Sequence, residues 1–304
     1  MINPDLSVSL AGITLRNPVM PASGCFGYGR EYAQYYPLKL LGAVVVKATT
    51  LEPRFGNLPP RVTEVTGGML NAIGLANPGV KHVVEYELPW LAEQDVPVIV
   101  NVAGQTAAEY VKVARVIANS GLAAAIELNV SCPNVAAGGI SFGVDPEVLR
   151  QLVLAVRQVC QIPLIVKLSP NVTDIRPLAI AAQEAGADGI SLINTLVGMR
   201  IDLQRRQPFL SNKTGGLSGP AIKPVAIRMV YEVAQVVDIP IIGMGGITNG
   251  TDALEFIMAG ASAVMVGTAN FTDPMACPRI IAEIESFMRD NNIENLQQIR
   301  GCVL

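Results

Sequence analysis

The sequence has few charged and few aromatic residues. Only 15% of its 304 residues are Asp, Glu, Lys or Arg, only 5% are aromatic, and the formal net charge is −3. The charges are dispersed, so the chain has neither the basic face that binds nucleic-acid phosphates nor a polybasic cluster for a membrane surface. The composition therefore argues against nucleic-acid partners and against a protein of the membrane surface.

Long apolar segments are also missing, although half of the residues are hydrophobic. The two longest charge-free runs, residues 128–144 and 256–272, have 17 residues each and are interrupted by Gly, Asn and Ser or Thr. Neither run is a credible membrane span. The first ten residues, MINPDLSVSL, lack the basic and apolar regions of a signal peptide, and we expect none.

Histidine and cysteine are scarce. His82 is the only histidine, and no cluster of His, Cys or carboxylates suggests a metal site. The number of cysteines is odd, they are dispersed, and no two form a CxxC pair. This pattern is typical of reduced thiols, so we expect a cytoplasmic protein. The cysteines are Cys25, Cys132, Cys160, Cys277 and Cys302.

Short β-branched apolar runs alternate with helix-length amphipathic segments, including residues 107–119, 146–159 and 220–236. Eight such repeats are the number that closes a parallel (β/α)8 TIM barrel, and apolar runs suit strands buried on both faces. The alternative, a doubly wound open sheet, would be expected to show a G-x-G-x-x-G turn, which is absent. The predicted strands are residues 17–23, 43–49, 96–102, 124–130, 164–169, 189–195, 240–246 and 263–268.

No linker divides the chain, so we predict a single domain over residues 1–304. Residues 6–10 and 13–16 flank Ala11-Gly12 and predict a β-hairpin at the bottom of the barrel. Long connections follow strands two, four and six, at residues 48–78, 130–144 and 195–219, and are candidate lids.

Each predicted strand ends in a polar residue or glycine, at the rim where barrel enzymes place their chemistry. Lys47 and Lys167 end apolar strands, which favours a shared anionic ligand over structural ion pairs with Glu127. Gly245-Gly246 and Gly267-Thr268 end the last two strands, where this fold often binds phosphate; plain turn glycines are the alternative for either pair alone.

The segment Asn129-Val130-Ser131-Cys132-Pro133-Asn134 follows the fourth predicted strand. It places the thiol of Cys132 at the rim as a nucleophile or a general base, and the polar flanks argue against a core cysteine. Asn71, Asn129 and Asn194 add neutral amides, which suit a planar ring with carbonyl and N–H groups, although loop asparagines also form turns.

At these residues the chain resembles the dihydroorotate dehydrogenases along essentially its full length. The resemblance rests on PASGCFGYG, VVVKATT, PRFGNLPPR, MLNAIGLANPG, NVAG, ELNVSCPN, VKLSPN, INT, GGLSGPAIKP, GMGGI and VGTANF. The thiol in NVSCPN, where a membrane-associated class would carry serine, is similar to the soluble class 1 enzymes. PASGCFGYG, VKATTL and NLPPR resemble the catalytic FMN subunit of the NAD-linked class 1B enzyme more than the fumarate-linked class 1A enzyme.

The resemblance implies oxidation of (S)-dihydroorotate to orotate with bound FMN, in pyrimidine (UMP) biosynthesis. Cys132 would be the base that removes a proton from C5, while a hydride leaves C6 for flavin N5. The residues lining the substrate would be Lys47, Asn71, Ala72, Ile73, Gly74, Leu75, Asn129, Asn194 and Thr195. The residues holding FMN would be Ser23, Lys47, Ala48, Asn101, Asn129, Lys167, Ile193, Gly219, Gly245, Gly246, Gly267 and Thr268.

The resemblance also implies a partner. The chain has no dinucleotide fingerprint and no cysteine cluster for an iron–sulfur centre. The NAD-linked subtype uses a separate subunit that carries FAD and a [2Fe–2S] cluster and binds a homodimer of barrels, giving a heterotetramer. Other functions left open are the fumarate-linked enzyme, a flavin enzyme for another pyrimidine, a Schiff-base aldolase or isomerase, and a non-catalytic binding barrel.

Overall fold

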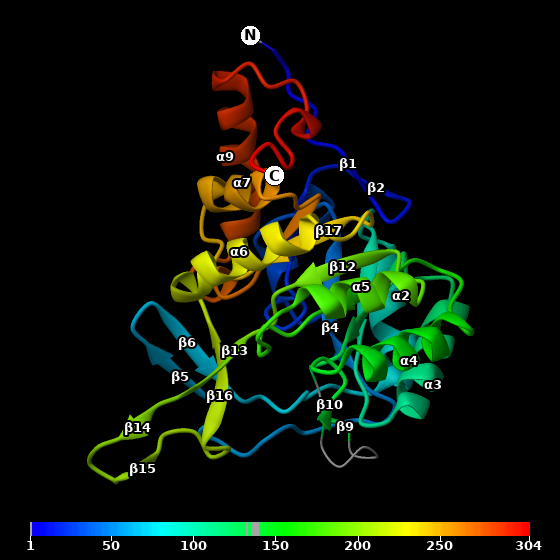
Figure 1. Cartoon of the computed structure of the whole chain (residues 1–304), viewed down its shortest axis with the longest axis vertical. Coiled ribbons are helices and arrows are strands. Elements are labelled where there is room, and N and C mark those ends of the chain that lie inside the picture. The colour runs from blue at the N-terminus through cyan, green and yellow to red at the C-terminus, as the bar shows by residue number, and fades with distance from the viewer. Residues whose placement is uncertain (1, 132, 135–139) are drawn as a thin grey trace.

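The computed structural model describes residues 2–131, 133–134 and 140–304. Eight parallel strands form one sheet in the order β3-β18-β17-β12-β11-β8-β7-β4, which nearly closes on itself (Figure 1). This confirms the predicted (β/α)8 barrel. The strands are β3 (Val19–Pro21), β4 (Val44–Thr49), β7 (Val98–Val102), β8 (Ala125–Asn129), β11 (Leu164–Lys167), β12 (Gly189–Leu192), β17 (Ile241–Met244) and β18 (Ala263–Val266).

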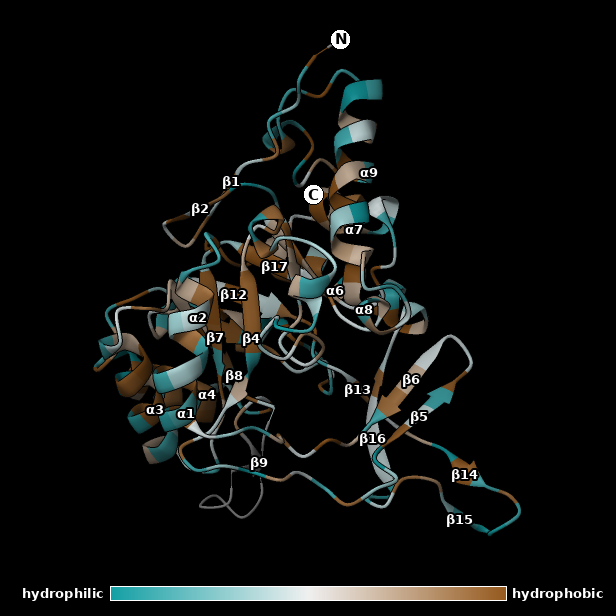
Figure 2. Cartoon of the chain, turned by 180° about the vertical axis from the view of Figure 1, so that it is seen from behind, coloured by the Kyte–Doolittle hydropathy of each residue, from teal (hydrophilic) through white to brown (hydrophobic). Residues whose placement is uncertain are grey.

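Each predicted strand contains the observed one and is longer, because the apolar runs continue beyond the hydrogen-bonded ladder at one or both ends. The strands are buried almost throughout. Their ribbons have the brown colour of hydrophobic residues in Figure 2. This burial on both faces is why their sequences are apolar runs without alternation.

Helices follow the strands and cover the outside of the barrel. The prediction of 107–119 is confirmed to the residue, and the segment 220–236 begins as a separate short turn because Pro220 and Pro224 interrupt helical hydrogen bonding. The α-helices are α1 (Val80–His82), α2 (Leu88–Ala92), α3 (Ala107–Asn119), α4 (Pro146–Arg157), α5 (Arg176–Glu184), α6 (Lys223–Ala234), α7 (Gly250–Met258), α8 (Ala269–Thr272) and α9 (Ala276–Asp290). The other helical turns are η1 (Tyr32–Gln34), η2 (Leu38–Leu40), η3 (Val83–Glu87), η4 (Pro220–Ile222) and η5 (Leu296–Gln298).

The predicted N-terminal hairpin is present as β1 (Val8–Leu10) and β2 (Ile13–Leu15), with Val8 opposite Leu15. Leu10 and Leu15 are fully buried, and the side chain of Ala11 lies against Gly189, the first residue of β12. The hairpin therefore packs under the N-terminal ends of the barrel strands, as expected, on the side of the molecule opposite the β14–β15 arm (Figure 1).

The three long connections carry short strands of their own. The connections after β4 and β12 together form one antiparallel sheet in the order β13-β16-β6-β5. Its strands are β5 (Val62–Val65), β6 (Gly68–Asn71), β13 (Leu196–Met199) and β16 (Thr214–Ser218). The second connection also forms β14 (Ile201–Asp202) and β15 (Gln207–Pro208). The connection after β8 includes β9 (Pro133–Asn134) and β10 (Ile140–Ser141); a lid function for it stays a prediction.

No helix within the described ranges combines the length and the apolar character needed to cross a bilayer.

The barrel depends on a close backbone approach between its first two strands. β3 and β4 are the two ends of the sheet order, and the Gly42 N–H joins them by donating to the Val19 carbonyl at 2.9 Å. A Cβ at Gly42 would lie 2.2 Å from the backbone oxygen of Asn17, far inside van der Waals contact. Glycine is therefore required at this seam.

We expect Gly42→Ala to lower the free energy of unfolding by about 1–3 kcal/mol, because the backbone of Asn17 must move. Urea denaturation followed by circular dichroism measures the loss. Gly24→Ala is the matched control, since a Cβ at Gly24 meets nothing within 4 Å. Equal stability of the two variants would contradict the importance of the seam.

Candidate functional site

A buried carboxylate lies inside the barrel. Glu127 of β8 is fully buried and accepts hydrogen bonds from Asn101 Nδ2 of β7 at 2.5 Å and from Ser191 Oγ of β12 at 2.7 Å. Lys167 Nζ of β11 lies 3.9 Å from Glu127 Oε1. Glu127 and its three partners lie on four different strands, so the carboxylate links these strands inside the barrel.

Lys167 connects this carboxylate to the rim. Its Nζ donates to Ser23 Oγ, 3.4 Å away on the segment after β3, so the side chain crosses the interior of the barrel. Lys167 thus forms the ion pair with Glu127 that was the structural alternative to a shared anionic ligand. It also reaches Ser23, one of the residues predicted to hold the cofactor. Lys167 therefore serves both the ion pair inside the barrel and the contact with the rim.

Asn101 has a free acceptor. Its side-chain nitrogen is used by Glu127, whereas Oδ1 is buried and has no hydrogen-bond partner among the described residues. A buried polar atom without a partner costs about 1–3 kcal/mol, so such atoms are rare in native proteins. An N–H group of a ligand in the barrel mouth would satisfy it.

Lys47 lies in a different environment. It sits in β4 beside a break in the register with β7, and Ala48 next to it is buried. Burial lowers the pKa of the Lys47 ammonium, and the nearby Arg61 lowers that pKa further. Within the described part of the chain no carboxylate lies within ion-pair distance of Lys47, so its charge is available to an anionic ligand.

Cys25 lies near both lysines, and the sequence did not indicate it as part of the site. Burial raises the pKa of its thiol to about 11, although the positive charges of Lys167 and Lys47 act in the opposite direction. The thiol is therefore protonated at neutral pH and is no base. Its position two residues after Ser23 was the available signal.

The glycines at the last two strand ends differ in what they require. Gly245 and Gly246 have φ angles of 128° and 80°, and a Cβ on Gly246 would lie 2.9 Å from the Gly219 carbonyl oxygen. Backbone conformation and close packing therefore explain these two without a ligand. A Cβ on Gly267 would make only ordinary contacts, at 3.6 Å with Cys25 Sγ and 3.8 Å with Ala22, so protein packing does not demand glycine there.

The residues predicted to hold the cofactor around these glycines come together. Thr268 Oγ1 donates to Ser218 Oγ at 2.8 Å, and Ser218 precedes Gly219, which packs against Gly246. The Ile193 N–H donates to the Met244 carbonyl at 3.0 Å, next to Gly245. The strand ends of β12, β17 and β18 and the end of β16 thus converge on one part of the rim.

The predicted substrate amides form a second group. Asn194 Nδ2 donates to Ser131 Oγ at 2.8 Å and to Asn129 Oδ1 at 3.3 Å, and Asn194 Oδ1 accepts from the Thr195 N–H at 2.8 Å. Asn129 pairs in register with Lys167 on the neighbouring strand. The amides therefore lie beside the lysine that reaches the cofactor residues.

Gly216 of β16 connects Asn71 to this group. Asn71 Nδ2 donates to the Gly216 carbonyl at 3.4 Å, and a Cβ on Gly216 would lie 2.0 Å from Thr195 Oγ1. Asn71 and Thr195 are 124 positions apart (195 − 71), and both lie near Gly216 because β6 pairs with β16 and β16 with β13.

The segment Asn71–Leu75 is held by two asparagines that the sequence reasoning missed. Asn57 contacts Ala72, Ile73 and Gly74: its Nδ2 donates to the Ala72 carbonyl at 3.0 Å, its N–H donates to the Ile73 carbonyl, and it fills the space where Gly74 would carry a Cβ. Asn77 Nδ2 donates to the Leu75 carbonyl at 2.7 Å. Leu75 has a φ of 57°, an uncommon conformation for a branched residue and one often found at functional sites.

Cys132, predicted as the base, lies outside the described residues, as do residues 135–139 of the same connection. His82 is half-exposed and lies 3.2 Å from Glu87 Oε1, so it is a surface residue. Among the residues that the structure describes, no group of three His, Cys, Asp or Glu side chains is placed to hold a metal ion.

A profile of the family described as "Dihydroorotate dehydrogenase" matches residues 5–288. The chain is 60% identical to "Dihydroorotate dehydrogenase B (NAD(+)), catalytic subunit" of Geobacillus sp. strain WCH70 over 296 residues, covering 97% of this chain and 95% of that protein. It is 58% identical to the protein of the same name from Halalkalibacterium halodurans, covering 97% of each.

Among solved structures, the crystal structure of a dihydroorotate dehydrogenase from Eimeria tenella in complex with ferulenol is similar. Its TM-score is 0.80 at 25% identity, and the alignment covers 98% of this chain and 88% of the other. The family profile spans nearly the whole chain, and the similarity to the catalytic subunits extends over the barrel and its rim connections. The chain belongs to the dihydroorotate dehydrogenase family.

Proposed function

We propose that this chain oxidises (S)-dihydroorotate to orotate with FMN as its cofactor, as a step of UMP biosynthesis. The observation that carries the proposal is the barrel mouth. There the unpaired Asn101 Oδ1 lies beside Glu127, Lys167 reaches the rim, and Lys47 has no carboxylate partner among the described residues. Two cations and one unpaired acceptor suit a planar ring with carbonyl and N–H groups.

The residues present fit FMN. Asn101 Oδ1 would accept from a ring N–H, and Gly267 leaves open the space that a side chain would occupy. The strand ends at Gly245, Gly246 and Thr268 would supply backbone N–H groups to the phosphate. FMN, when bound, supplies the acceptor for the hydride from C6 of dihydroorotate.

The chain's own residues would then bind the substrate and move its proton. Asn71, Asn129, Asn194 and Thr195 would orient the ring, since amides both donate and accept hydrogen bonds. Lys47 would bind the substrate carboxylate, and Cys132 would take the proton from C5. Cys25 has a protonated thiol at neutral pH and lies beside both lysines, so it is no substitute for that base.

We further propose that residues 1–304 act as one cytoplasmic barrel domain, which forms a homodimer and passes electrons to a partner subunit with FAD and a [2Fe–2S] cluster. The similar proteins from Geobacillus and Halalkalibacterium are named catalytic subunits of an NAD(+) enzyme, which supports a partner and the NAD-linked subtype over the fumarate-linked one.

Replacing the proposed base tests the proton transfer. We expect Cys132→Ala to retain FMN but to lose turnover by about 10²–10⁴-fold, the usual contribution of a general base. Cys132→Ser should keep some activity, mainly at high pH, because a hydroxyl is a poorer base at neutral pH. Steady-state assays with a dye acceptor measure both, and full activity of the alanine variant would remove Cys132 from the mechanism.

Asn77 should act on the substrate without touching it. The buried amide joins Leu75 to Thr50, with Nδ2–Thr50 Oγ1 at 2.8 Å, and it fixes the segment that contains Asn71. We expect Asn77→Ala to raise KM for dihydroorotate by about tenfold, the effect of one lost buried hydrogen bond on binding, with flavin content unchanged. Loss of flavin with an unchanged KM would contradict this role.

The acceptor that the reduced enzyme uses tests whether a partner subunit is required. We expect the purified chain to reduce artificial dyes with dihydroorotate but not NAD+, and to reduce NAD+ only after an FAD- and [2Fe–2S]-containing subunit is added. Absorbance at the NADH band measures the difference. Rapid NAD+ reduction by the chain alone would refute the partner, and efficient turnover with fumarate would indicate the other soluble subtype.

A further inference from the structure

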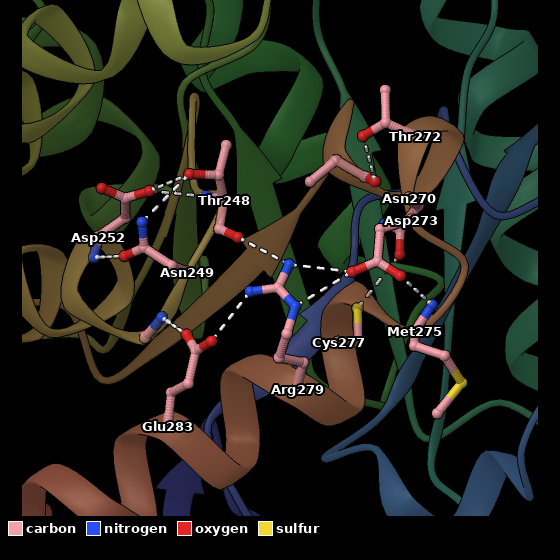
Figure 3. Close-up of polar contacts among 12 residues, drawn as sticks. Thr248, Asn249, Asp252, Asn270, Thr272, Asp273, Met275, Cys277, Arg279 and Glu283 are labelled. Carbon is pink, nitrogen blue, oxygen red and sulfur yellow. Dashed lines mark hydrogen bonds and ion pairs between the residues drawn. The ribbon is translucent and has the colours of Figure 1, made fainter.

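A polar network on the outside of the barrel joins the connections that follow β17 and β18 (Figure 3). We call residues 245–249 the β17 loop and residues 267–273 the β18 segment. Each contains residues proposed above to bind the FMN phosphate, Gly245 and Gly246 in the first and Thr268 in the second. The first two turns of α9 contact both, and the residues of these contacts are absent from the proposed binding site.

Arg279 of α9 makes the central contacts. Its Nη2 donates to the Thr248 carbonyl of the β17 loop at 3.1 Å and to Asp273 Oδ2 of the β18 segment at 3.0 Å (Figure 3). Its Nε also donates to Asp273 Oδ2, at 3.1 Å, and its Nη1 donates to Glu283 at 3.0 Å. One guanidinium therefore holds both connections, and all three of its nitrogens are in use.

One further contact joins α9 to the β17 side, and another, from α7, fixes the β17 loop. Glu283 Oε2 accepts from the Gly250 N–H at 2.5 Å, at the start of α7. A Cβ on Gly250 would lie 2.5 Å from Glu283 Cβ, so only glycine permits this approach. Asp252 Oδ2 accepts from the Thr248 N–H at 2.8 Å and from its hydroxyl at 2.6 Å, which fixes the residue whose carbonyl Arg279 binds.

A buried contact fixes α9 to the β18 side. Burial raises the pKa of the Cys277 thiol, which keeps its proton and donates to Asn270 Oδ1 at 3.4 Å. Asn270 is 1% exposed, and its Nδ2 donates to the carbonyls of Val266 at 2.8 Å and Gly267 at 3.1 Å. The position of Gly267 is thus tied to the same turns of α9 that hold Thr248.

The network contributes little to the free energy of unfolding, but it determines how the two connections are placed relative to each other. Arg279, Asp273 and Glu283 are 41%, 36% and 39% exposed, and ion pairs this accessible contribute only about 0–1 kcal/mol. The planar guanidinium nevertheless fixes the direction of each hydrogen bond. A phosphate bound by backbone groups of two separate connections is sensitive to the distance between them.

We propose that Arg279 is a positioning residue for the FMN phosphate: it sets the spacing between the β17 loop and the β18 segment without contacting the cofactor. Its charge is compensated by Asp273 and Glu283, so a direct ion pair with the phosphate is not its role. This inference rests on the proposed function, because it takes FMN as the ligand of these connections.

The test compares flavins with and without the phosphate. Apoprotein is titrated with FMN and with riboflavin, and the quenching of flavin fluorescence gives each Kd. In Arg279→Ala we expect the Kd of FMN to rise about tenfold, the effect of one backbone hydrogen bond to the phosphate that is no longer well aligned, while the Kd of riboflavin stays that of the wild type. A general structural defect would weaken the binding of both flavins.

Arg289→Ala is the matched control. Arg289 lies on the same helix and pairs with Glu285 at 2.5 Å, with both side chains exposed to a similar degree, but it contacts neither connection. We expect this variant to bind both flavins as the wild type does and to melt, as apoprotein, at the same temperature as Arg279→Ala. Asp273→Ala removes the contact of Arg279 with the β18 segment together with the hydrogen bond from the Met275 N–H to Asp273 Oδ1, and it should weaken FMN binding in the same selective way.

Equal FMN affinity in Arg279→Ala and Arg289→Ala would overturn the inference, as would a parallel loss of riboflavin binding. Failure of the wild-type chain to bind FMN would instead contradict the proposed function. The two failures are therefore distinguishable within one series of titrations.

Discussion

The Glu127 carboxylate inside the barrel is the interaction on which the site depends. A fully buried charge is tolerated only with close partners, and removing one member of such a buried pair costs about 3–5 kcal/mol. Asn101, Lys167 and Ser191 supply those partners from three other strands. By binding Glu127, Asn101 is left with its oxygen free, and Lys167 is held where it also reaches Ser23. The charge compensation inside the barrel thereby orients the groups at its mouth.

The two lysines at the rim differ because only one of them has a carboxylate partner. Lys167 is compensated inside the protein, whereas burial and the neighbouring Arg61 lower the pKa of Lys47. An anionic ligand would relieve this destabilisation of the charged form of Lys47, because an opposite charge favours protonation. The same reasoning assigns Cys25 a passive role, since burial outweighs both lysines and keeps its thiol protonated.

The rim connections are positioned from outside the barrel as well as from within. The antiparallel sheet β13-β16-β6-β5 brings Asn71 and Thr195 to the same residue, Gly216, and Asn57 and Asn77 hold the backbone that follows Asn71. On the other side, α9 holds the connections after β17 and β18 through Arg279 and Cys277. In both places the contacts to the ligand would come from loops, while residues behind those loops determine their position.

The sequence by itself determined the barrel, because eight apolar runs separated by amphipathic helices have few other ways to bury both faces. It also placed Lys47, Asn129, Lys167 and Gly267 at the rim, since the end of each run is visible locally. Tertiary structure alone decided which of these groups are free. The pairing of Glu127 with Lys167, the packing of Cys25 against Gly267 and the bridge from Arg279 to Thr248 join residues far apart in the chain. Such contacts leave no periodicity in the sequence, because they depend on how strands and helices meet in space.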